Sequence, residues 1–485
     1  MRRKGATASV VRSPAVRITV ALCAAAVTIG TSRPLAAQEA VTFARFAAQV
    51  EANHPEALQA GLVRAQARSA VQEAWGGFDP KFSLAVGQKA YKNDPYYTYV
   101  DAGLKIPTPI GADIKVGFER AAGTRVSEDR ITPRQGLLSL GVSLPLGQRI
   151  ITDERRTALS VARAQRQIGD AEQQALLNKL LLNAAKAYGD WYAAFQRSAI
   201  AEEGVRLATF RFDAVVQRVR NGENAPVDTL EASLEVQRRS VTFAEADNEL
   251  RAARLIAEAF LWDARGVPVS LSAGARPVLD GLERTPIDTL RLSGWIASVS
   301  ARHPDVRKAD GRLQAAQAER LLARQAIIPF AEAFVASLGE RNQFGELRDS
   351  DRWGDNYKAG LDVTSSLLLL RERGKASRTE QKEEFARLDL DLIRRELAYN
   401  VRIALNDVVL LERVLVTQRA NVIAATQLRD AEQGRFLGGE STLLIVNIRE
   451  RLLLDESVKL ASVEGKLAAA RAALVVAVGD ASLVP

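Results

Sequence analysis

The chain has 485 residues, of which 47% are hydrophobic and 26% are charged, and it carries 66 basic against 58 acidic side chains. Six of the basic residues and none of the acidic residues lie in the first 37 positions, so the rest of the chain has a net charge of only +2. A nearly neutral chain without a basic patch argues against nucleic-acid binding, which needs such a patch in the folded domain.

The first 37 residues have the pattern of a secretory signal peptide: a basic start, an apolar stretch at 18–30, and small residues at Ala36 and Ala37. We expect the mature chain to begin near Gln38. The single cysteine, Cys23, lies inside this segment, so no disulfide is expected in the mature protein. Because no later segment offers the roughly 20 apolar residues of a spanning helix, we expect any membrane contact to be made by strands.

Two matching motifs indicate an internal duplication. Residues 53–56 (NHPE) and 302–305 (RHPD) contain the only two histidines of the chain, 249 residues apart. Proline suits the first turn of a helix, whereas zinc needs three or four ligands, so we interpret both motifs as helix starts and not as metal sites. We predict a signal peptide at 1–37, a first repeat at 38–270, a linker at 271–285 and a second repeat at 286–485, with a helix, strands and two long helices in each repeat.

Segments in which apolar residues alternate with polar or small ones, the signature of strands, follow the first helical stretch of each half. Their apolar members are Phe82, Leu84 and Val86; Ile114, Val116 and Phe118; Leu138, Leu140, Val142 and Leu144; and Tyr357, Ala359, Leu361 and Val363.

A half-buried strand of a soluble sheet has the same pattern. The export signal, strand lengths of about 9–11 residues and aromatic residues near the strand ends favour a membrane barrel. We expect an interfacial girdle made of Tyr96, Tyr97, Tyr99, Trp353 and Tyr357.

Very long helices are predicted after the strands, because no proline occurs between Pro145 and Pro226 or between Pro329 and Pro485. Residues 152–220 would form a helix about 100 Å long, which needs a partner along its length. Heptad spacing supplies three coiled-coil seams: Ala201, Val205, Ala208, Phe212, Val215 and Val219; Leu397, Val401, Ala404, Val408, Leu411 and Leu415; and Val446, Leu453, Leu460, Leu467 and Leu474.

The helix after Asp228 carries two seams, so we expect neighbours on both of its sides, as in a closed wall of helices. The seams are Leu230, Leu234, Val241 and Leu255, and Val236, Phe243, Leu250 and Ala257. Short turns at 220–233 and 435–447 join the long helices, and their Asn-Gly and Gly-Gly pairs supply the positive φ that ends a helix. Asp228 and Glu231 form an Asp-x-x-Glu capping pattern that is predicted to start the next helix.

The two His-Pro starts, the junction VSLPLGQRIITDERR at 142–156, and the tips GENAPVDTLEASLEVQRRS at 222–240 and GGESTLLIVNIRERLL at 438–453 resemble the TolC-like outer-membrane efflux protein family. The resemblance covers essentially the whole mature chain. It implies a mixed, mainly α-helical fold: a trimer in which each copy gives four strands to one twelve-stranded outer-membrane β-barrel, continued by a long coiled-coil barrel in the periplasm.

A channel of this kind has no active site and no cofactor. The resemblance implies an exit duct for a tripartite efflux or type I secretion system, with a periplasmic adaptor, an inner-membrane pump, outer-membrane lipid and two further copies of the chain as partners. The alternative is a secreted periplasmic coiled-coil adaptor or scaffold, which normally lacks two equivalent halves with paired strands. A hydrolase is disfavoured, because the mature sequence has no cysteine and no Gly-x-Ser-x-Gly elbow.

The chain departs from the family pattern in its strands and at its entrance. Residues 97–106 and 112–120 form an extra hairpin, which we interpret as an extracellular or rim extension outside the barrel. The familiar lock of an acid, a tyrosine and an arginine is not transferable, since Phe436 and Ser441 replace the last two and Ile445 and Ile448 replace the acids of the entrance ring.

We therefore predict an apolar constriction made by Ile445 and Ile448 at the entrance, with packing in a heptad core against a neighbouring helix as the alternative role of Ile445. The gate candidates are Asp228, Arg435, Ile445, Asn447, Ile448 and Arg449, and the expected adaptor contacts are Asn221, Gly222, Glu223, Asn224, Gly438, Gly439, Glu440 and Ser441.

Overall fold

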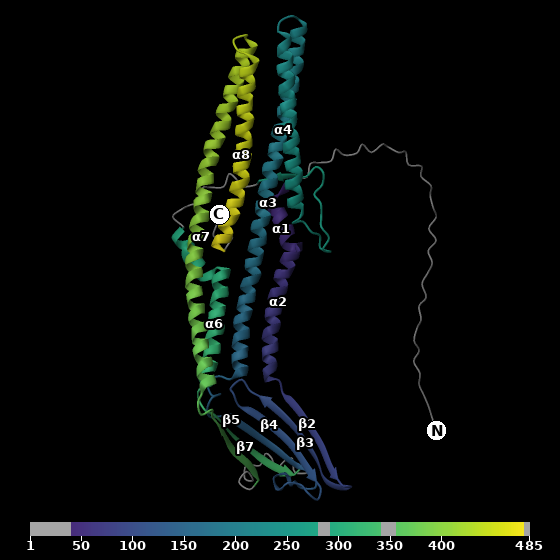
Figure 1. Ribbon diagram of the computed structural model, residues 1–485, viewed down its shortest axis with the longest axis vertical. Coiled ribbons are helices and arrows are strands. Elements are labelled where there is room, and N and C mark those ends of the chain that lie inside the picture. Colours follow the sequence, from purple (N-terminus) through teal and green to yellow (C-terminus); the bar gives the residue numbers. More distant parts are fainter. Residues whose placement is uncertain (1–39, 280–291, 341–355, 480–485) are drawn as a thin grey trace, which may run out of the picture.

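The computed structural model describes residues 40–279, 292–340 and 356–479. The predicted signal peptide, part of the predicted linker and Trp353 lie outside these described residues. The molecule is elongated, with a β-sheet at one end and the turns of two helical hairpins at the other (Figure 1). The helices within the described ranges all lack the continuous apolar stretch that a bilayer-spanning helix requires.

The elements follow the same order in both halves: two short helices, then strands, then two long helices. The first half comprises β1 (Ala40–Thr42), α1 (Phe43–Asn53), α2 (Pro55–Trp75), η1 (Gly76–Phe78), β2 (Lys81–Tyr91), β3 (Asp94–Pro107), β4 (Asp113–Ala122), η2 (Glu128–Arg130), β5 (Leu137–Pro145), α3 (Glu154–Arg220), α4 (Pro226–Glu258) and β6 (Arg276–Val278). The second half comprises α5 (Leu292–Arg302), α6 (Pro304–Gln325), β7 (Phe330–Glu340), β8 (Tyr357–Thr364), α7 (Leu370–Leu437) and α8 (Leu443–Val478). The repeat boundaries given above stay a prediction.

Both His-Pro motifs start helices, as predicted. The Nδ1 atoms of His54 and His303 cap α2 and α6 by accepting the backbone N–H of Glu56 and Asp305, each at 3.2 Å. Burial lowers the pKa of both imidazoles, because a buried ring is more stable in its neutral form. The neutral ring is also the form whose Nδ1 can accept the capping bond.

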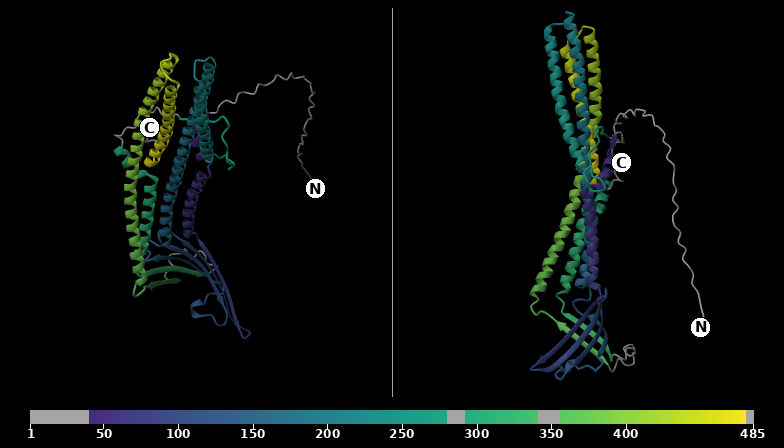
Figure 2. Two further views of the ribbon diagram at one scale, coloured as in Figure 1. Left: turned by 45° about the horizontal axis from the view of Figure 1, so that its top comes forward. Right: turned by 90° about the vertical axis from the view of Figure 1, so that its right-hand side faces the viewer.

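The predicted long helices are confirmed, with 67 residues in α3 and 68 in α7. Each extends about 100 Å at 1.5 Å per residue. Near the turns the helices lie in the order α4–α3–α8–α7, and near the sheet in the order α2–α3–α6–α7 (Figures 1 and 2). The helices therefore form a curved wall, with α3 continuous in its interior and α7 along one margin.

The three predicted seams are confirmed as packing contacts between these helices. Their buried members are Ala201, Ala208 and Val215 on α3, Leu397, Val401, Val408 and Leu415 on α7, and Val446, Leu467 and Leu474 on α8. Each half also has its own core, one built mainly from α1, α3 and α4 and the other from α5 to α8. The two halves pack closely where α3 meets α8: a β-carbon on Gly189 would lie only 2.7 Å from the carbonyl oxygen of Gly465.

The six strands at the far end form one antiparallel sheet in the order β2-β3-β4-β5-β7-β8. Residues that face each other across an antiparallel pair share a face of the sheet. The apolar members of all the predicted strands lie on one face: Phe82 is opposite Leu104, Val116 is opposite Leu140, Val142 is opposite Val335, and Leu361 is opposite Ala333. The predicted alternation is therefore confirmed.

The extra hairpin is not an appendage to a four-stranded sheet, so that interpretation is wrong. Its strands, β3 and β4, lie inside the sheet, where β3 pairs with β2 and β4 pairs with β5. Local sequence signals a hairpin but not the neighbours to which its outer edges bond. Within the described residues this sheet has six strands, not four.

The expected aromatic girdle is wrong for Tyr97 and Tyr99. Tyr99 is opposite Gly87, and a β-carbon on Gly87 would lie 2.4 Å from the tyrosine ring, so Tyr99 covers the glycine on the polar face of the sheet. Tyr97 lies on the same face, with its ring 6.0 Å from that of Tyr99. Tyr357 lies on the apolar face, opposite Ser337. A large ring beside a strand glycine fills the space that the missing side chain leaves.

Candidate entrance and adaptor surface

The two hairpin turns at the helical end have the same backbone geometry. Gly222 and Gly439 adopt φ values of +78° and +79°. The residue after each glycine donates its N–H to a carbonyl five residues earlier: Glu223 to Arg218 and Glu440 to Arg435, both at 2.9 Å. Glycine meets the positive φ without a steric penalty. The predicted helix-ending role of both glycines is confirmed.

The predicted adaptor contacts are accessible in this copy of the chain. Most of them are exposed, and two are half-buried, Asn224 and Ser441. A β-carbon on Gly222 or Gly439 would have nothing within 4 Å. Both turns therefore present small, polar, open surface at the far end of the wall.

The capping pattern predicted at Asp228 is wrong, because α4 starts earlier. Its N-cap is Ala225, Pro226 occupies the first turn, and no side chain caps the helix. Proline is favoured in the first turn of a helix, because its fixed φ is already helical and its missing N–H would have no partner there. Asp228 instead lies inside the first turn, where a carboxylate interacts favourably with the helix dipole, and its Oδ2 accepts the side-chain N–H of Asn224 at 2.9 Å.

The α7–α8 turn is held by a buried acid that sequence reasoning missed. Glu432, only 6% exposed, accepts the hydroxyl of Ser441 and lies 3.6 Å from Arg435. The ring of Phe436 lies under the guanidinium of Arg218, 5.2 Å from its carbon, which joins the ends of α3 and α7. Arg435 and Ser441 thus have partners within the turn region of this copy.

Two turns into α8, a charged clamp joins α3 to α8. Arg211 donates to both carboxylate oxygens of Glu450, at 2.6 and 2.8 Å, and to the side-chain oxygen of Asn447 at 2.8 Å. The Glu450 side chain is 3% exposed and that of Arg211 is 17% exposed. Bidentate geometry and low exposure make this a strong pair once formed. Asn447, a gate candidate, is therefore part of an interhelical clamp.

The other gate candidates on α8 lie on a different face from the clamp. Ile445 and Ile448, three residues apart, are 39% and 52% exposed, while Val446 between them is buried against the wall. Arg449 is half-buried, and no ion pair joins it to any residue within 40–279, 292–340 or 356–479. The apolar pair thus faces outward from this copy of the helical wall.

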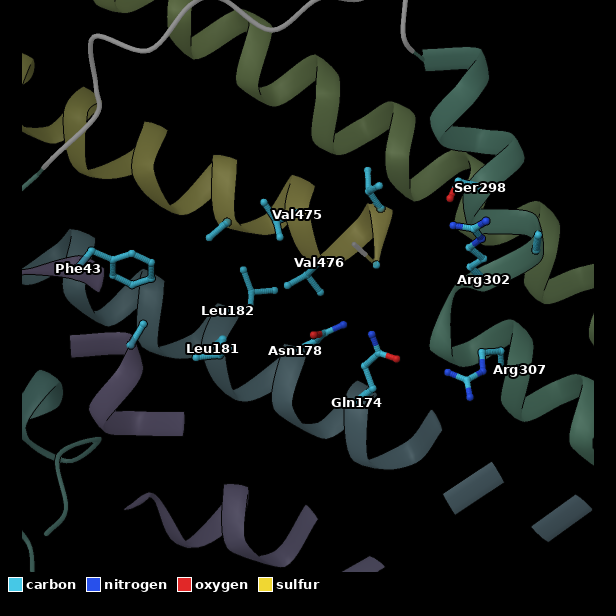
Figure 3. A pocket seen from close by; sticks show the side chains of 15 residues that line it. Phe43, Gln174, Asn178, Leu181, Leu182, Ser298, Arg302, Arg307, Val475 and Val476 are labelled. Carbon is cyan, nitrogen blue, oxygen red and sulfur yellow. The ribbon is translucent and has the colours of Figure 1, made fainter. Parts of the chain in front are cut away.

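A cavity of about 880 Å³ lies in the middle of the wall, between the two halves of the chain. Gln174 and Asn178 of α3 face Val475 and Val476 of α8 across it, and Arg302 lies at one end (Figure 3). The sequence contained no signal for this cavity, because its lining comes from five helices. Its polar groups include no nucleophile paired with a base, and the described ranges contain no cluster of three metal-ligating side chains.

The comparisons agree with this architecture. Residues 295–480 match the family model described as outer membrane efflux protein. No curated protein sequence matches the chain. Among solved structures, the open state of the MtrE outer membrane channel of Neisseria gonorrhoeae is similar, with a TM-score of 0.63 at 15% identity over 90% of this chain and 89% of that one.

Two other channels have the same fold. The outer-membrane channel OprN has a TM-score of 0.60 at 16% identity, covering 91% of both chains. The outer membrane protein VceC of Vibrio cholerae has a TM-score of 0.59 at 14% identity over 90% of this chain and 96% of that one.

Proposed function

We propose that this chain, a TolC-like outer-membrane efflux protein by the family model that matches residues 295–480 and by its fold, is the exit duct of a tripartite efflux or type I secretion system. Members of this class are outer-membrane channels that extend into the periplasm, and they are not enzymes. In the proposed role the duct is passive: an inner-membrane pump supplies the energy, and an adaptor joins the pump to the helical turns.

The observation that carries this proposal is the placement of two unlike surfaces at opposite ends of one wall. A sheet with a continuous apolar face lies at one end, and the exposed glycine turns lie about 100 Å of helix away at the other. A lipid-facing surface and a docking surface so far apart suit a duct that bridges the periplasm.

The margins of the wall favour assembly with identical copies. On α4, the seam of Leu230, Leu234, Val241 and Leu255 is exposed in this copy, with 71% of Leu230 accessible. On α7, the opposite margin, Val416, Ile423 and Leu437 are exposed along the stretch nearest the turns, which is the level of α4. Two apolar stripes on opposite margins are complementary in a closed ring, in which one copy's α7 covers the next copy's α4. The family resemblance makes the ring a homotrimer.

The alternative, a secreted adaptor or scaffold, would account for the helical hairpins but not for six strands whose apolar face is open. The experiment that separates the two is fractionation of cells expressing the chain, followed by electrophoresis without heating. We expect trimer bands in the outer-membrane fraction, and we expect the purified trimers to conduct ions in planar bilayers. Recovery as soluble periplasmic protein would support the scaffold.

We expect Gly222→Arg and Gly439→Arg to abolish export while trimers still assemble. A β-carbon added at either position would meet no atom within 4 Å, but the positive φ strains the backbone of any larger residue, and the long arginine side chain would obstruct an approaching adaptor. The measurement is export of a pump substrate alongside trimer yield.

The matched control for the tip variants is Gly374→Arg, near the sheet end of α7. A β-carbon on this glycine would also have nothing within 4 Å, but the residue has an ordinary helical φ. We expect the control to export normally. Unimpaired export by both tip variants would remove the turns from the adaptor interface.

We further propose that the entrance closes through an apolar constriction at Ile445 and Ile448 and not through an acidic ring. Three-fold symmetry turns each lumenal side chain into a ring of three, and three isoleucines can exclude water. Ile448→Asp is expected to make the channel sensitive to block by multivalent cations in planar bilayers, whereas the unmodified channel is not blocked.

The control for this gate prediction is Thr442→Asp, which adds the same charge at the N-cap of α8, two turns nearer the tip. It is expected to cause weaker block, because the charges are not held at the constriction. Strong cation block of the unmodified channel, relieved by neutralising Glu440 or Asp228, would place the ring acids elsewhere and overturn the apolar gate.

A further inference from the structure

The β3–β4 hairpin has the properties of a membrane-spanning pair, beginning with its length. β3 has 14 residues and β4 has 10, against 9 to 11 in β2, β5 and β7. A barrel strand needs about 9–11 residues to cross the hydrocarbon core. Both strands of the hairpin are therefore as long as the strands that the sequence already assigned to the membrane.

The apolar face of the sheet runs across the hairpin without a break. One row of directly opposed residues crosses four strands: Phe82 on β2, Leu104 on β3, Val116 on β4 and Leu140 on β5. A second row, one pleat closer to the helices, joins Ile106, Ile114, Val142 and Val335. An extension in water would not need an apolar face aligned with that of its neighbours.

The opposite face of the hairpin is charged and suits a water-filled lumen. Lys105 is directly opposite Lys115, and Asp101 is directly opposite Glu119. Like charges at this separation repel unless water surrounds them. Lys115 also reaches Glu332 on β7, with 3.4 Å between Nζ and Oε1, so the charged face continues across the sheet.

The two ends of the sheet can close only with another copy. Within the described residues, β2 and β8 each pair with a strand on one side only, and almost every residue of both is exposed. Unpaired strand edges are not tolerated in the hydrocarbon region. Neighbouring strands of the sheet are antiparallel, so in a sheet of six strands the two edge strands, β2 and β8, run in opposite directions. β8 of one copy can therefore pair with β2 of the next copy and continue the antiparallel pattern.

We propose that each copy contributes six spanning strands, so that the trimer encloses an eighteen-stranded barrel and not the twelve strands that the family resemblance implies. This inference rests on the proposed trimeric channel. Barrel diameter grows roughly in proportion to strand number, so the outer-membrane lumen is about 1.5-fold wider than twelve strands allow. The wider exit, lined by the added charges of β3 and β4, admits bulkier cargo at the cell surface.

The first test uses adjacent single cysteines on β4 in outer membranes. The only native cysteine is Cys23, so a new thiol is the only one after the predicted signal. Lys115→Cys is expected to react with a charged, water-soluble maleimide, whereas Val116→Cys is expected to lose that labelling until detergent is added. Equal labelling of both would place the hairpin in water and overturn the proposal.

The reference pair for this test is Ser139→Cys and Leu140→Cys on β5, which lie on the polar and apolar faces of a strand outside the hairpin. Labelling that alternates between adjacent positions on β5 but not on β4 would contradict the eighteen-stranded barrel and would leave the proposed channel function unaffected. Equal labelling of adjacent positions on both strands would contradict the placement of the sheet in the membrane, and with it the proposed function.

The second test is a direct count by electron cryomicroscopy of purified trimers. Eighteen strand sections around the barrel support the proposal, and twelve overturn it. Deletion of residues 94–134, which leaves a short link between β2 and β5, gives an independent measure of width. In trimers of this deletion variant carrying Ser139→Cys, polyethylene glycol maleimides added from outside are expected to be excluded at a lower mass than in full-length trimers. An unchanged cut-off contradicts a role of the hairpin in lumen width.

Discussion

Arg211→Leu is expected to destabilise the helical wall by about 3–5 kcal/mol, the usual effect of leaving one member of a buried ion pair alone. The partner carboxylate of Glu450 is 3% exposed, and Arg211 donates a hydrogen bond to each of its two oxygens. Leucine cannot donate to it, and so little water reaches the site that the charge stays poorly solvated. The measurement is denaturant unfolding of the purified protein, followed by the loss of helical circular dichroism.

The control for this variant is the double substitution Arg211→Leu with Glu450→Leu. It removes both charges, and we expect it to recover most of the lost stability, because well-packed apolar residues replace buried ion pairs at little or no net loss. Equal stability of Arg211→Leu and the unmodified protein at neutral pH would show that the clamp contributes nothing.

Leu140→Arg is expected to cost about 2–4 kcal/mol and to reduce trimer yield sharply, the effect of a cation near the bilayer midplane on the lipid side of a barrel. Leu140 lies in the middle of β5 on the apolar face, opposite Val116 on one side and Ser337 on the other. Leu361→Arg on β8 should behave in the same way, because Leu361 lies on the same face and is 61% exposed in this copy. The measurement is the amount of trimer in unheated outer-membrane fractions.

The matched control for Leu140→Arg is Ser139→Arg, one residue away on the polar face, opposite Gly117. The same side chain on the same strand should be tolerated there, because a lumenal arginine stays hydrated. Normal trimer yield from both Leu140→Arg and Leu361→Arg would argue against these strands spanning the membrane. Equal loss from Ser139→Arg would indicate a strand defect unrelated to lipid.

Local sequence was enough to predict most of the elements. Proline-free runs with apolar residues three and four positions apart stabilise a helix from its own face. The sequence therefore predicted α3 within two residues of its ends, and α7 as a long helix that ends at the second turn. Glycine at the turns and proline after histidine act through the backbone of their own neighbours, and both signals were interpreted correctly. The alternation in the strands likewise identified one apolar and one polar face.

Tertiary structure decided every feature that depends on contacts between segments far apart in the sequence. The clamp joins Arg211 to Glu450, 239 residues away, and each looks in sequence like one more solvated charge on a long helix. Tyr99 lies on the polar face because its register with β2 sets it over Gly87, and register is a property of the pair of strands. The same holds for the β3–β4 hairpin. The sequence signals its turn through Pro107, Pro109 and Gly111, but only the hydrogen bonds along the outer edges of the hairpin, to β2 and β5, make it part of the sheet.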